Sequence, residues 1–240
     1  MNNFGYDPTN SGGGFANAPS GNWQSAEQSF VTKVFNWMFI GLMATGLVSY
    51  IVSSNPLLLQ AIYGNQIVFW VLAIGLFAMV WNLSANITKM SAQSAAINFF
   101  IYAALNGALL SSIFIVYTAS SIFSTFCICS ATFGVMALYG ATTKKDLTGI
   151  GNFAFMALIG LVIAQLVNIF LHSTGLESIM NYAGVLIFTA LTAYDVQKIK
   201  QIGSSVNFHP NFAISGALAL YLDFINMFLY LLRIFGDRRD

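Results

Sequence analysis

Charged residues are scarce in this sequence. Only 7% of its 240 residues are Asp, Glu, Lys or Arg, whereas 57% are hydrophobic. A soluble domain carries about 25% charged residues, so this chain has too few charges to cover a surface that faces water. A formal net charge of +1 provides no basic face for binding nucleic acid. We therefore predict a membrane protein that does not bind nucleic acid.

Cysteine and alternating strand patterns are also nearly absent. Cys127 and Cys129 lie two positions apart in an apolar segment, so on a helix they point to different faces. We interpret them as core or lipid-facing thiols rather than as a disulfide or a metal pair. A membrane β-barrel requires segments of about ten alternating residues, whereas this chain has long unbroken apolar runs. The predicted fold class is all-α and polytopic.

The chain divides into a polar tail and a membrane domain. Residues 1–28 are rich in Gly, Asn and Ser and poor in aliphatic side chains, which is typical of a disordered tail. Residues 29–240 form the predicted transmembrane domain, in which we count seven apolar segments, each near the twenty or so residues needed to cross a bilayer. The segments are about Val31–Val52, Ile67–Leu83, Ala95–Tyr117, Ser120–Tyr139, Phe153–Leu171, Ile179–Tyr194 with an amphipathic extension to Ile202, and a last segment that begins after Pro210.

The lysines predict how the chain is oriented. With seven spans, six lysines fall on the amino-terminal side, and loops 53–66, 118–120 and 172–178 have no Lys or Arg. The positive-inside rule then places the amino terminus in the cytoplasm. The six lysines are Lys33, Lys89, Lys144, Lys145, Lys198 and Lys200. Three arginines near the carboxyl end depart from this pattern, but the last segment is long enough that we expect it to cross fully.

Two aspartates stand out in the last two spans. Asp223 lies in the middle of the last segment and Asp195 near the end of the segment before it. An ionisable residue inside a span is by default a functional-site hypothesis. The two segments run antiparallel, and the two carboxyls differ in expected depth by only about 7 Å, so we predict that they form one site. The alternative for Asp195 is a solvated acid at a helix end, since lysines follow it.

A pair of carboxyls in a low-dielectric site has a definite chemistry. Both cannot stay ionised, so they are expected to share a proton, which makes the pair a pH switch. When both are ionised, Asp195 and Asp223 offer oxygen ligands to a hard cation, which predicts a transient calcium contact. Polar neighbours predicted to complete a cation path are Tyr194, Gln197, Tyr221, Asn226, Asn106, Ser111 and Ser112.

Several long motifs carry a resemblance to a known family. The strings LIFTALTAYDVQKIKQI and ALALYLDFINMFLYLLRIFG resemble the sixth and seventh helices of the Bax inhibitor-1 family of small membrane proteins. ALNGALLSSIFIVYT and ATFGVMALYGATTKKDLTGIG are similar to its third and fourth helices. The resemblance implies seven helices with the last one central, and a pH-sensitive calcium leak governed by a pair that matches Asp195 and Asp223. Arg233 matches a basic residue at the far end of the last helix.

The sequence also departs from the family pattern. Family members often end the second helix with Ser-Ala-Arg, whereas this chain has Ser84-Ala85-Asn86, so a lock built from the second helix is in doubt. The glycine-rich tail is similar to that of bacterial members, which implies the inner or plasma membrane; a eukaryotic member would occupy an intracellular membrane.

Three functions follow as hypotheses. The first is a calcium leak channel gated by the aspartate pair, with calcium as the permeant ion and no cofactor. The second is a non-conducting regulator that acts through a membrane protein partner, because the resemblance implies links to cell-death control and to a membrane protease. The third and most remote is an intramembrane aspartyl protease, which also uses a carboxylate dyad. Those enzymes place the second aspartate in Gly-x-Gly-Asp, whereas this chain has Leu220-Tyr221-Leu222-Asp223, so we expect no enzyme.

Overall fold

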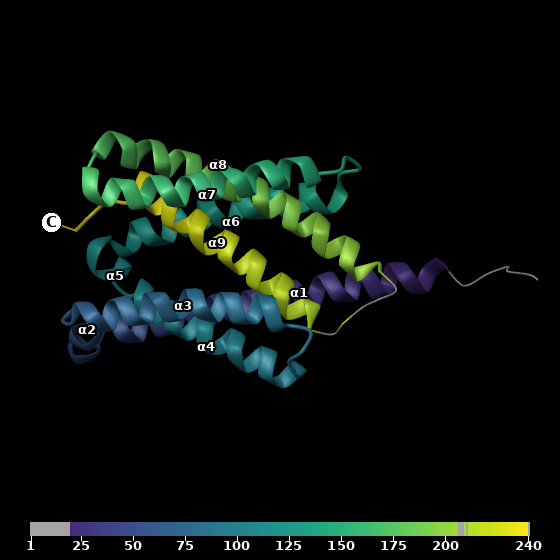
Figure 1. Cartoon of the computed structure of the whole chain (residues 1–240), viewed down its shortest axis with the longest axis horizontal. Coiled ribbons are helices and arrows are strands. Elements are labelled where there is room, and N and C mark those ends of the chain that lie inside the picture. Colours follow the sequence, from purple (N-terminus) through teal and green to yellow (C-terminus); the bar gives the residue numbers. More distant parts are fainter. Residues whose placement is uncertain (1–19, 206–208, 210, 240) are drawn as a thin grey trace, which may run out of the picture.

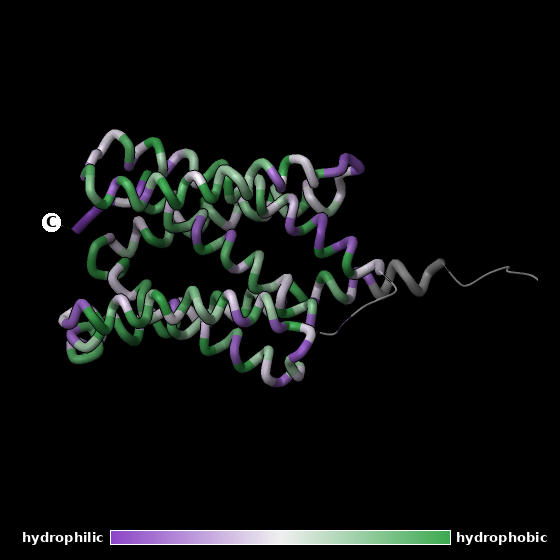
Figure 2. The backbone as a smooth tube through the Cα atoms, viewed as in Figure 1, coloured by the Kyte–Doolittle hydropathy of each residue, from purple (hydrophilic) through white to green (hydrophobic). Residues whose placement is uncertain are grey.

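Helices account for nearly all of the chain that the structure describes. The computed structural model describes residues 20–205, 209 and 211–239, with side chains from Glu27 onward. Seven helical segments are long and apolar enough to cross a membrane, which confirms the predicted fold class. They are α1 (Ser20–Ser53), α3 (Gln66–Asn86), α4 (Ala92–Leu110) continued by α5 (Ile113–Val116), α6 (Ala119–Thr142), α7 (Thr148–Leu171), α8 (Thr174–Gly203) and α9 (Phe212–Phe235). Figure 2 shows these helices as mainly hydrophobic along their lengths.

Two helical segments differ from the prediction. Helix α1 begins at Ser20, inside the stretch predicted as a disordered tail to residue 28, while residues 1–19 lie outside the described part. Ala and Glu, both good helix formers, support this early start. The predicted loop between the first two spans contains helix α2 (Pro56–Tyr63), where the Asn55 side chain accepts a hydrogen bond from the Leu57 N–H. Asn-Pro, interpreted as the end of a span, is therefore also the start of the next helix.

Helix α9 is the centre of the bundle. In its most apolar 18-residue window 67% of the residues are buried, against 11% for α3 and for α7. It packs against α8, α1 and α6, and to a lesser extent against α4. Figure 1 shows α9 in yellow running obliquely between α1–α4 on one side and α6–α8 on the other. A central last helix, the arrangement implied by the family resemblance, is therefore what the structure has.

The helices approach closely where small residues meet a neighbouring backbone. A side chain added at Gly107 of α4 would collide with the backbone of Thr45 in α1, and one added at Gly140 of α6 would collide with the backbone of Ala193 in α8. Small residues at such points let helices pack tightly in lipid. These contacts fix α1 against α4 and α6 against α8, the two helix pairs that flank α9.

The two ends of α9 lie at opposite ends of the bundle. Just before it begins, the Asn211 side chain donates hydrogen bonds to the carbonyls of Ile87 (2.9 Å) and Met90 (2.7 Å). Just after it ends, the carbonyl of Asp237 accepts a hydrogen bond from the Thr118 N–H at 3.1 Å. This arrangement is what a full crossing requires. We call the end that carries connections 87–91, 143–147 and 204–211 the lysine-rich end; its cytoplasmic placement stays a prediction.

Candidate functional site

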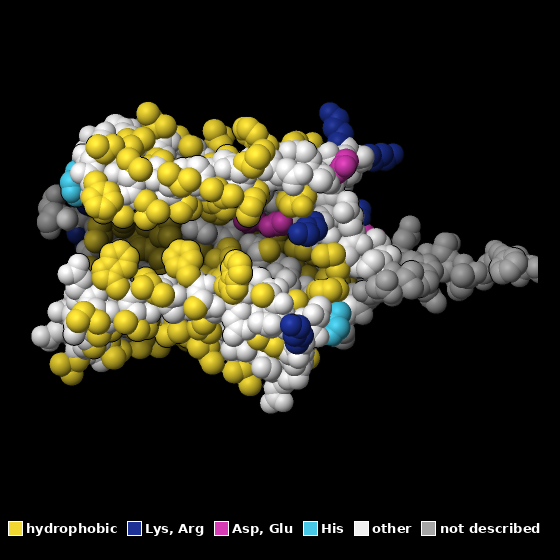
Figure 3. Space-filling view, viewed as in Figure 1, with side chains coloured by type: hydrophobic (Ala, Val, Ile, Leu, Met, Phe, Trp, Pro, Cys, Tyr) yellow, Lys and Arg dark blue, Asp and Glu magenta, His cyan; other side chains and the backbone are white. Residues whose placement is uncertain are grey.

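The site lies between α8 and α9, where the structure brings Asp195 and Asp223 together. Asp223 is 4% exposed, whereas Asp195 is partly exposed. Their carboxyl groups lie within hydrogen-bonding reach of each other. The antiparallel course of α8 and α9, with a short connection at the lysine-rich end, places the two residues at the same depth. Figure 3 shows a hollow between the two halves of the bundle, with acidic and basic side chains gathered in it toward the lysine-rich end.

One oxygen of Asp223 lacks a donor. Its Oδ2 atom is buried and receives no hydrogen bond from the residues that the structure describes. A buried acceptor without a partner costs about 1–3 kcal/mol, and more if it is charged. Two carboxylates cannot donate to each other, but a single proton held between them supplies the missing donor. The geometry therefore suits a pair of carboxyls that holds one proton.

The charge nearest to the pair is a cation on the same helix. Lys198 follows Asp195 by three residues and interacts electrostatically with its carboxyl group. Asp195 is partly exposed and near this ammonium, whereas Asp223 is almost completely buried. The two carboxyls thus occupy unequal environments.

A second polar cluster surrounds Tyr221 on a different face of α9. The Tyr221 hydroxyl lies 2.6 Å from the hydroxyl of Thr45 and accepts a hydrogen bond from the Asn106 amide at 2.8 Å. Thr45 also donates to the carbonyl of Ala103 at 2.9 Å. Residues two apart on a helix are separated by about 200° around its axis, so this cluster faces α1 and α4 while Asp223 faces α8. The predicted single path through Tyr221 and Asn106 is therefore divided between two faces.

The other predicted neighbours of the pair have partners elsewhere. The ring of Tyr194 packs against Gly151 and lies 5.8 Å from the Lys198 ammonium. Asn226 donates to the carbonyl of Leu222 in its own helix at 2.8 Å. Arg233 is exposed at the opposite end of the bundle, where its guanidinium lies 5.5 Å from the centre of the Tyr230 ring. Among the described contacts, the partners of Tyr194, Asn226 and Arg233 are therefore other residues and not the two aspartates.

The remaining residues of the predicted path, Gln197, Ser111 and Ser112, also have partners elsewhere, and the Ser112 N–H donates a hydrogen bond to the Tyr63 hydroxyl at 3.3 Å. Gln197 accepts a hydrogen bond from the Leu147 N–H and donates one to the Lys145 carbonyl, both at 2.8 Å, so it belongs to connection 143–147. Ser111 is buried and donates to the carbonyl of Ala108. Sequence reasoning did not single out Thr45, although its place between the small residues Ala44 and Gly46 was an available signal.

The second helix contributes no charge to the site. Asn86, which stands where family members often have arginine, donates from its amide to the side chain of Asn82 in the same helix at 3.0 Å. This contact agrees with the doubt raised from the sequence about a lock built from this helix. Asn86 therefore does not act as a partner of the aspartate pair in the described contacts.

The pair suits brief contact with a cation better than permanent retention of one. No group of three or more His, Cys, Asp or Glu side chains able to hold a metal occurs among the described residues. Calcium takes six to eight oxygen ligands, and two carboxylates supply only part of that number. The remaining ligands of a calcium ion at this point would be water and main-chain carbonyls.

Comparison with known proteins identifies relatives of the chain. Residues 27–240 match the sequence model of a family described as "Inhibitor of apoptosis-promoting Bax1". The inner membrane protein YbhL of Escherichia coli strain K12 is 47% identical over 217 residues, which cover 88% of this chain and 93% of that protein. An uncharacterized protein of Borreliella burgdorferi is 42% identical over 218 residues, covering 89% of this chain and 94% of its own. An uncharacterized membrane protein of Streptococcus pyogenes is 35% identical over 211 residues, covering 86% and 92% respectively.

Proposed function

Because the chain belongs to the Bax inhibitor-1 family of multi-pass membrane proteins, we propose that it is a non-enzymatic, pH-sensitive calcium leak channel whose proton sensor is the pair Asp195 and Asp223. The observation that carries this proposal is the buried contact between two carboxyls, one of which has an oxygen without a donor. The similarity to an inner membrane protein of E. coli supports the inner membrane as its location. The occurrence of all six lysines at one end of the bundle supports a cytoplasmic amino terminus.

In the closed state the pair holds one proton. A hydrogen bond between a carboxyl and a carboxylate is charge-assisted and short, so it fastens α8 to α9 near the lysine-rich end. This bond joins a partly exposed residue to a buried one, so the proton can be exchanged with solvent from the Asp195 side. The hollow between the two halves of the bundle (Figure 3) is the surface from which water would reach it.

Loss of the proton opens the pair. Two unit charges about 4 Å apart repel by about 4 kcal/mol at an effective dielectric constant of 20, which is comparable to the few kcal/mol that separate conformational states and is therefore enough to shift their populations. Repulsion separates α8 from α9 at this depth, and the freed carboxylate oxygens then face a passing cation. Calcium flux is therefore expected to rise as pH rises, because ionisation both opens the contact and creates the ligands.

The test is calcium flux into proteoliposomes of the purified chain between pH 5 and 8. Wild type is expected to show a flux that increases with pH, whereas Asp223→Asn and Asp195→Asn each give a flux that does not change with pH. Asp146→Asn is the matched control, because Asp146 is an exposed acid outside the helices and its loss is expected to leave the profile intact. An unchanged pH profile in both pair variants, or no flux above that of empty liposomes, contradicts the proposal.

The description of the family supports a second candidate. It names inhibition of an apoptosis-promoting protein, which is a function exercised through another protein. In this alternative the chain is a non-conducting regulator of a membrane partner such as a protease. Absence of flux together with recovery of one specific membrane protein after cross-linking in native membranes would favour it. Flux that depends on Asp223 in a purified system would favour the channel.

A further inference from the structure

A cavity at the lysine-rich end lies apart from the aspartate pair. It has a volume of about 320 Å³ and lies between the start of α1, the end of α6, connection 143–147 and the end of α8. Apart from Gly140, the residues that line it have polar or charged side chains, and three of them are lysines, Lys144, Lys145 and Lys200. No step of the proposed channel function uses these side chains.

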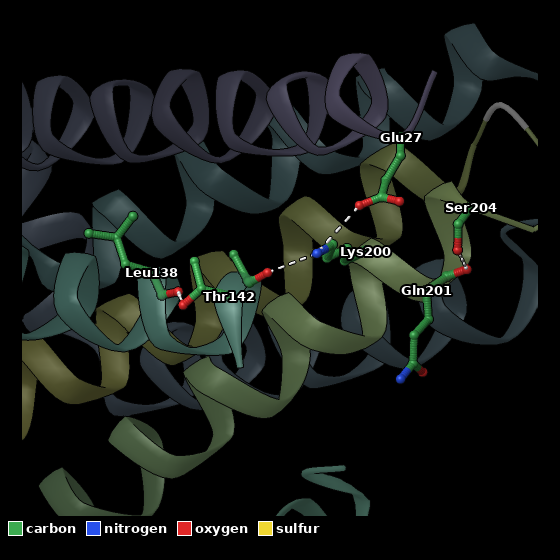
Figure 4. Close-up of polar contacts among 7 residues, drawn as sticks. Glu27, Leu138, Thr142, Lys200, Gln201 and Ser204 are labelled. Carbon is green, nitrogen blue, oxygen red and sulfur yellow. Dashed lines mark hydrogen bonds and ion pairs between the residues drawn. The ribbon is translucent and has the colours of Figure 1, made fainter. Parts of the chain in front are cut away.

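Specific contacts hold the walls of the cavity in place. Lys200 donates a hydrogen bond to the carbonyl of Ala141 at the end of α6 (2.9 Å), and its ammonium lies 3.7 Å from a carboxylate oxygen of Glu27 in α1. Figure 4 shows Lys200 between these two partners. On the adjacent wall the Gln197 amide binds connection 143–147 through its contacts with Lys145 and Leu147. The walls that α1, α6 and α8 contribute are thus joined by an ion pair and by hydrogen bonds before any ligand arrives.

The charges around the cavity leave a positive excess. Of its two carboxylates, that of Glu27 is paired with Lys200. That of Asp146 accepts hydrogen bonds from the Thr148 N–H (2.9 Å) and hydroxyl (2.6 Å). Lys144 and Lys145 have no ion-pair partner among the residues that the structure describes. With three lysines and two carboxylates the lining carries a net charge of +1, and neither Lys144 nor Lys145 is held in a described ion pair.

We propose that this cavity binds a phosphate group, carried either by the headgroup of an anionic phospholipid or by a phosphorylated solute. Lysine binds phosphate as a point charge, and basic pockets between transmembrane helices bind phospholipid headgroups. On α6, which contributes Gly140 to the lining, Leu138 and Val135 are 68% and 65% exposed, so the same helix also presents an apolar outer face to acyl chains.

Lysine reactivity in lipid nanodiscs tests the proposal with controls inside the same molecule. The full chain is acetylated with an amine-reactive reagent in three settings: neutral phosphatidylcholine discs, discs with added phosphatidylglycerol, and neutral discs with inorganic phosphate. Rates at Lys144 and Lys145 are compared by mass spectrometry with rates at Lys33 and Lys89, which are exposed and lie at the same end but outside the cavity. We expect labelling of Lys144 and Lys145 to slow about fivefold, since one lysine contributes about 1 kcal/mol toward an anionic lipid.

The settings separate the two sources of phosphate. Slower labelling only with phosphatidylglycerol identifies a lipid headgroup, and slower labelling in neutral discs with inorganic phosphate identifies a solute. Equal slowing at all four lysines would show a general attraction to the membrane surface and would overturn the proposal, as would no slowing at Lys144 and Lys145 in either setting.

A pair of variants supplies an independent measurement. Native mass spectrometry of the detergent-solubilised chain with phosphatidylglycerol is expected to show at least tenfold weaker lipid retention in Lys144→Gln with Lys145→Gln, because two contributions of about 1 kcal/mol are lost. The control, Lys33→Gln with Lys89→Gln, removes the same charge at the same end and is expected to retain lipid like wild type. Equal retention in the two double variants contradicts the assignment.

Discussion

Helix α9 carries two polar clusters that lie back to back and differ in one respect. On the side of α1 and α4, the hydroxyl of Tyr221 contacts both Thr45 and Asn106. On the side of α8, Asp223 contacts Asp195 but keeps a buried oxygen that has no donor among the described residues. The two residues are separated by one position in the chain, share the same depth in the bundle and are both nearly inaccessible to solvent.

We infer from this difference that α9 has an anchored face, which carries Tyr221 and meets α1 and α4, and a face that responds to pH, which carries Asp223 and meets α8. We call the second one the responsive face. Polar groups whose hydrogen bonds are complete, as around Tyr221, hold the bundle in one arrangement. In the proposed function, the buried acceptor of Asp223 is satisfied by a shared proton, so the packing of α8 against α9 is expected to depend on pH. We infer that α1, α4 and α9 form the fixed part, against which α8 moves.

The largest expected effect is on the pH dependence of thermal stability when Asp223, on the responsive face, is replaced. Wild type is expected to lose thermal stability as pH rises, because ionisation of both aspartates introduces repulsion on the order of 2–4 kcal/mol, or a fall in Tm on the order of 10 °C for a chain of this size. In Asp223→Asn only one charge remains, so Tm is expected to stay nearly level. Thermal unfolding in detergent across pH 5–9 measures this, with Glu177→Gln, an exposed acid at the start of α8, as the control. A slope equal to that of wild type in Asp223→Asn would contradict the shared proton.

The next largest effect is expected on Tm when the hydrogen bonds of Tyr221, on the anchored face, are removed. Tyr221→Phe removes the hydroxyl and leaves the Asn106 amide without its acceptor, while Thr45 keeps its bond to Ala103. Hydrogen bonds between transmembrane helices are worth about 0.6 kcal/mol on average and about 1.7 at most, so Tm is expected to fall by a few degrees at every pH. The pH slope itself should be preserved. Tyr182→Phe, an exposed tyrosine of α8, is the control and is expected to have no effect; a changed slope in Tyr221→Phe would show that the two faces are coupled.

A smaller quantity measures the independence of the two clusters directly. In a double-mutant cycle, Thr45→Val and Tyr221→Phe are expected to show a coupling energy of about 0.5–2 kcal/mol, since the two hydroxyls are in contact. Asp223→Asn and Tyr221→Phe are expected to add within about 0.5 kcal/mol, since their side chains lie on different faces of the helix. Unfolding of the four chains of each cycle at a single pH gives both energies. Coupling of equal size in the two cycles would remove the distinction between the faces.

Much of the fold could be predicted from the sequence. Each apolar run of about twenty residues became a membrane-length helix because its side chains leave no alternative to burial in lipid or core. The contact between Asp195 and Asp223 followed from offsets along two antiparallel helices that share a short connection. Helix α2 was missed because a segment of only eight residues between two spans looks like part of a loop, and the start signal at Asn55-Pro56 was interpreted only as a stop.

The assignment of side chains to faces could not be predicted as well. Tyr221 and Gln197 were grouped with the aspartates because they are near them in the sequence, yet each lies two residues away and therefore on another face of its helix. Helix α9 is buried on most sides, so hydrophobic periodicity does not reveal which face meets which neighbour. That choice depends on tertiary packing, such as the close approach of α4 to α1 at Gly107.

The smallest expected effect concerns an acid whose hydrogen bonds are complete and which faces water. Hydrogen bonds from the hydroxyl and N–H of Thr148 hold the pKa of Asp146 below its usual range. A depressed pKa in the folded state gives stability that is fully present above the unfolded value of about 3.9 and is lost as pH falls through the lower folded value. Asp146→Asn is therefore expected to lower Tm slightly and by the same amount from pH 5 to 8, with the difference from wild type shrinking below about pH 4. Thr148→Ala should reproduce the small loss. If Asp146→Asn instead flattened the wild-type slope between pH 5 and 8, the pH response would belong to the lysine-rich end rather than to the buried carboxyls, and the contrast between the two faces of α9 would no longer explain it.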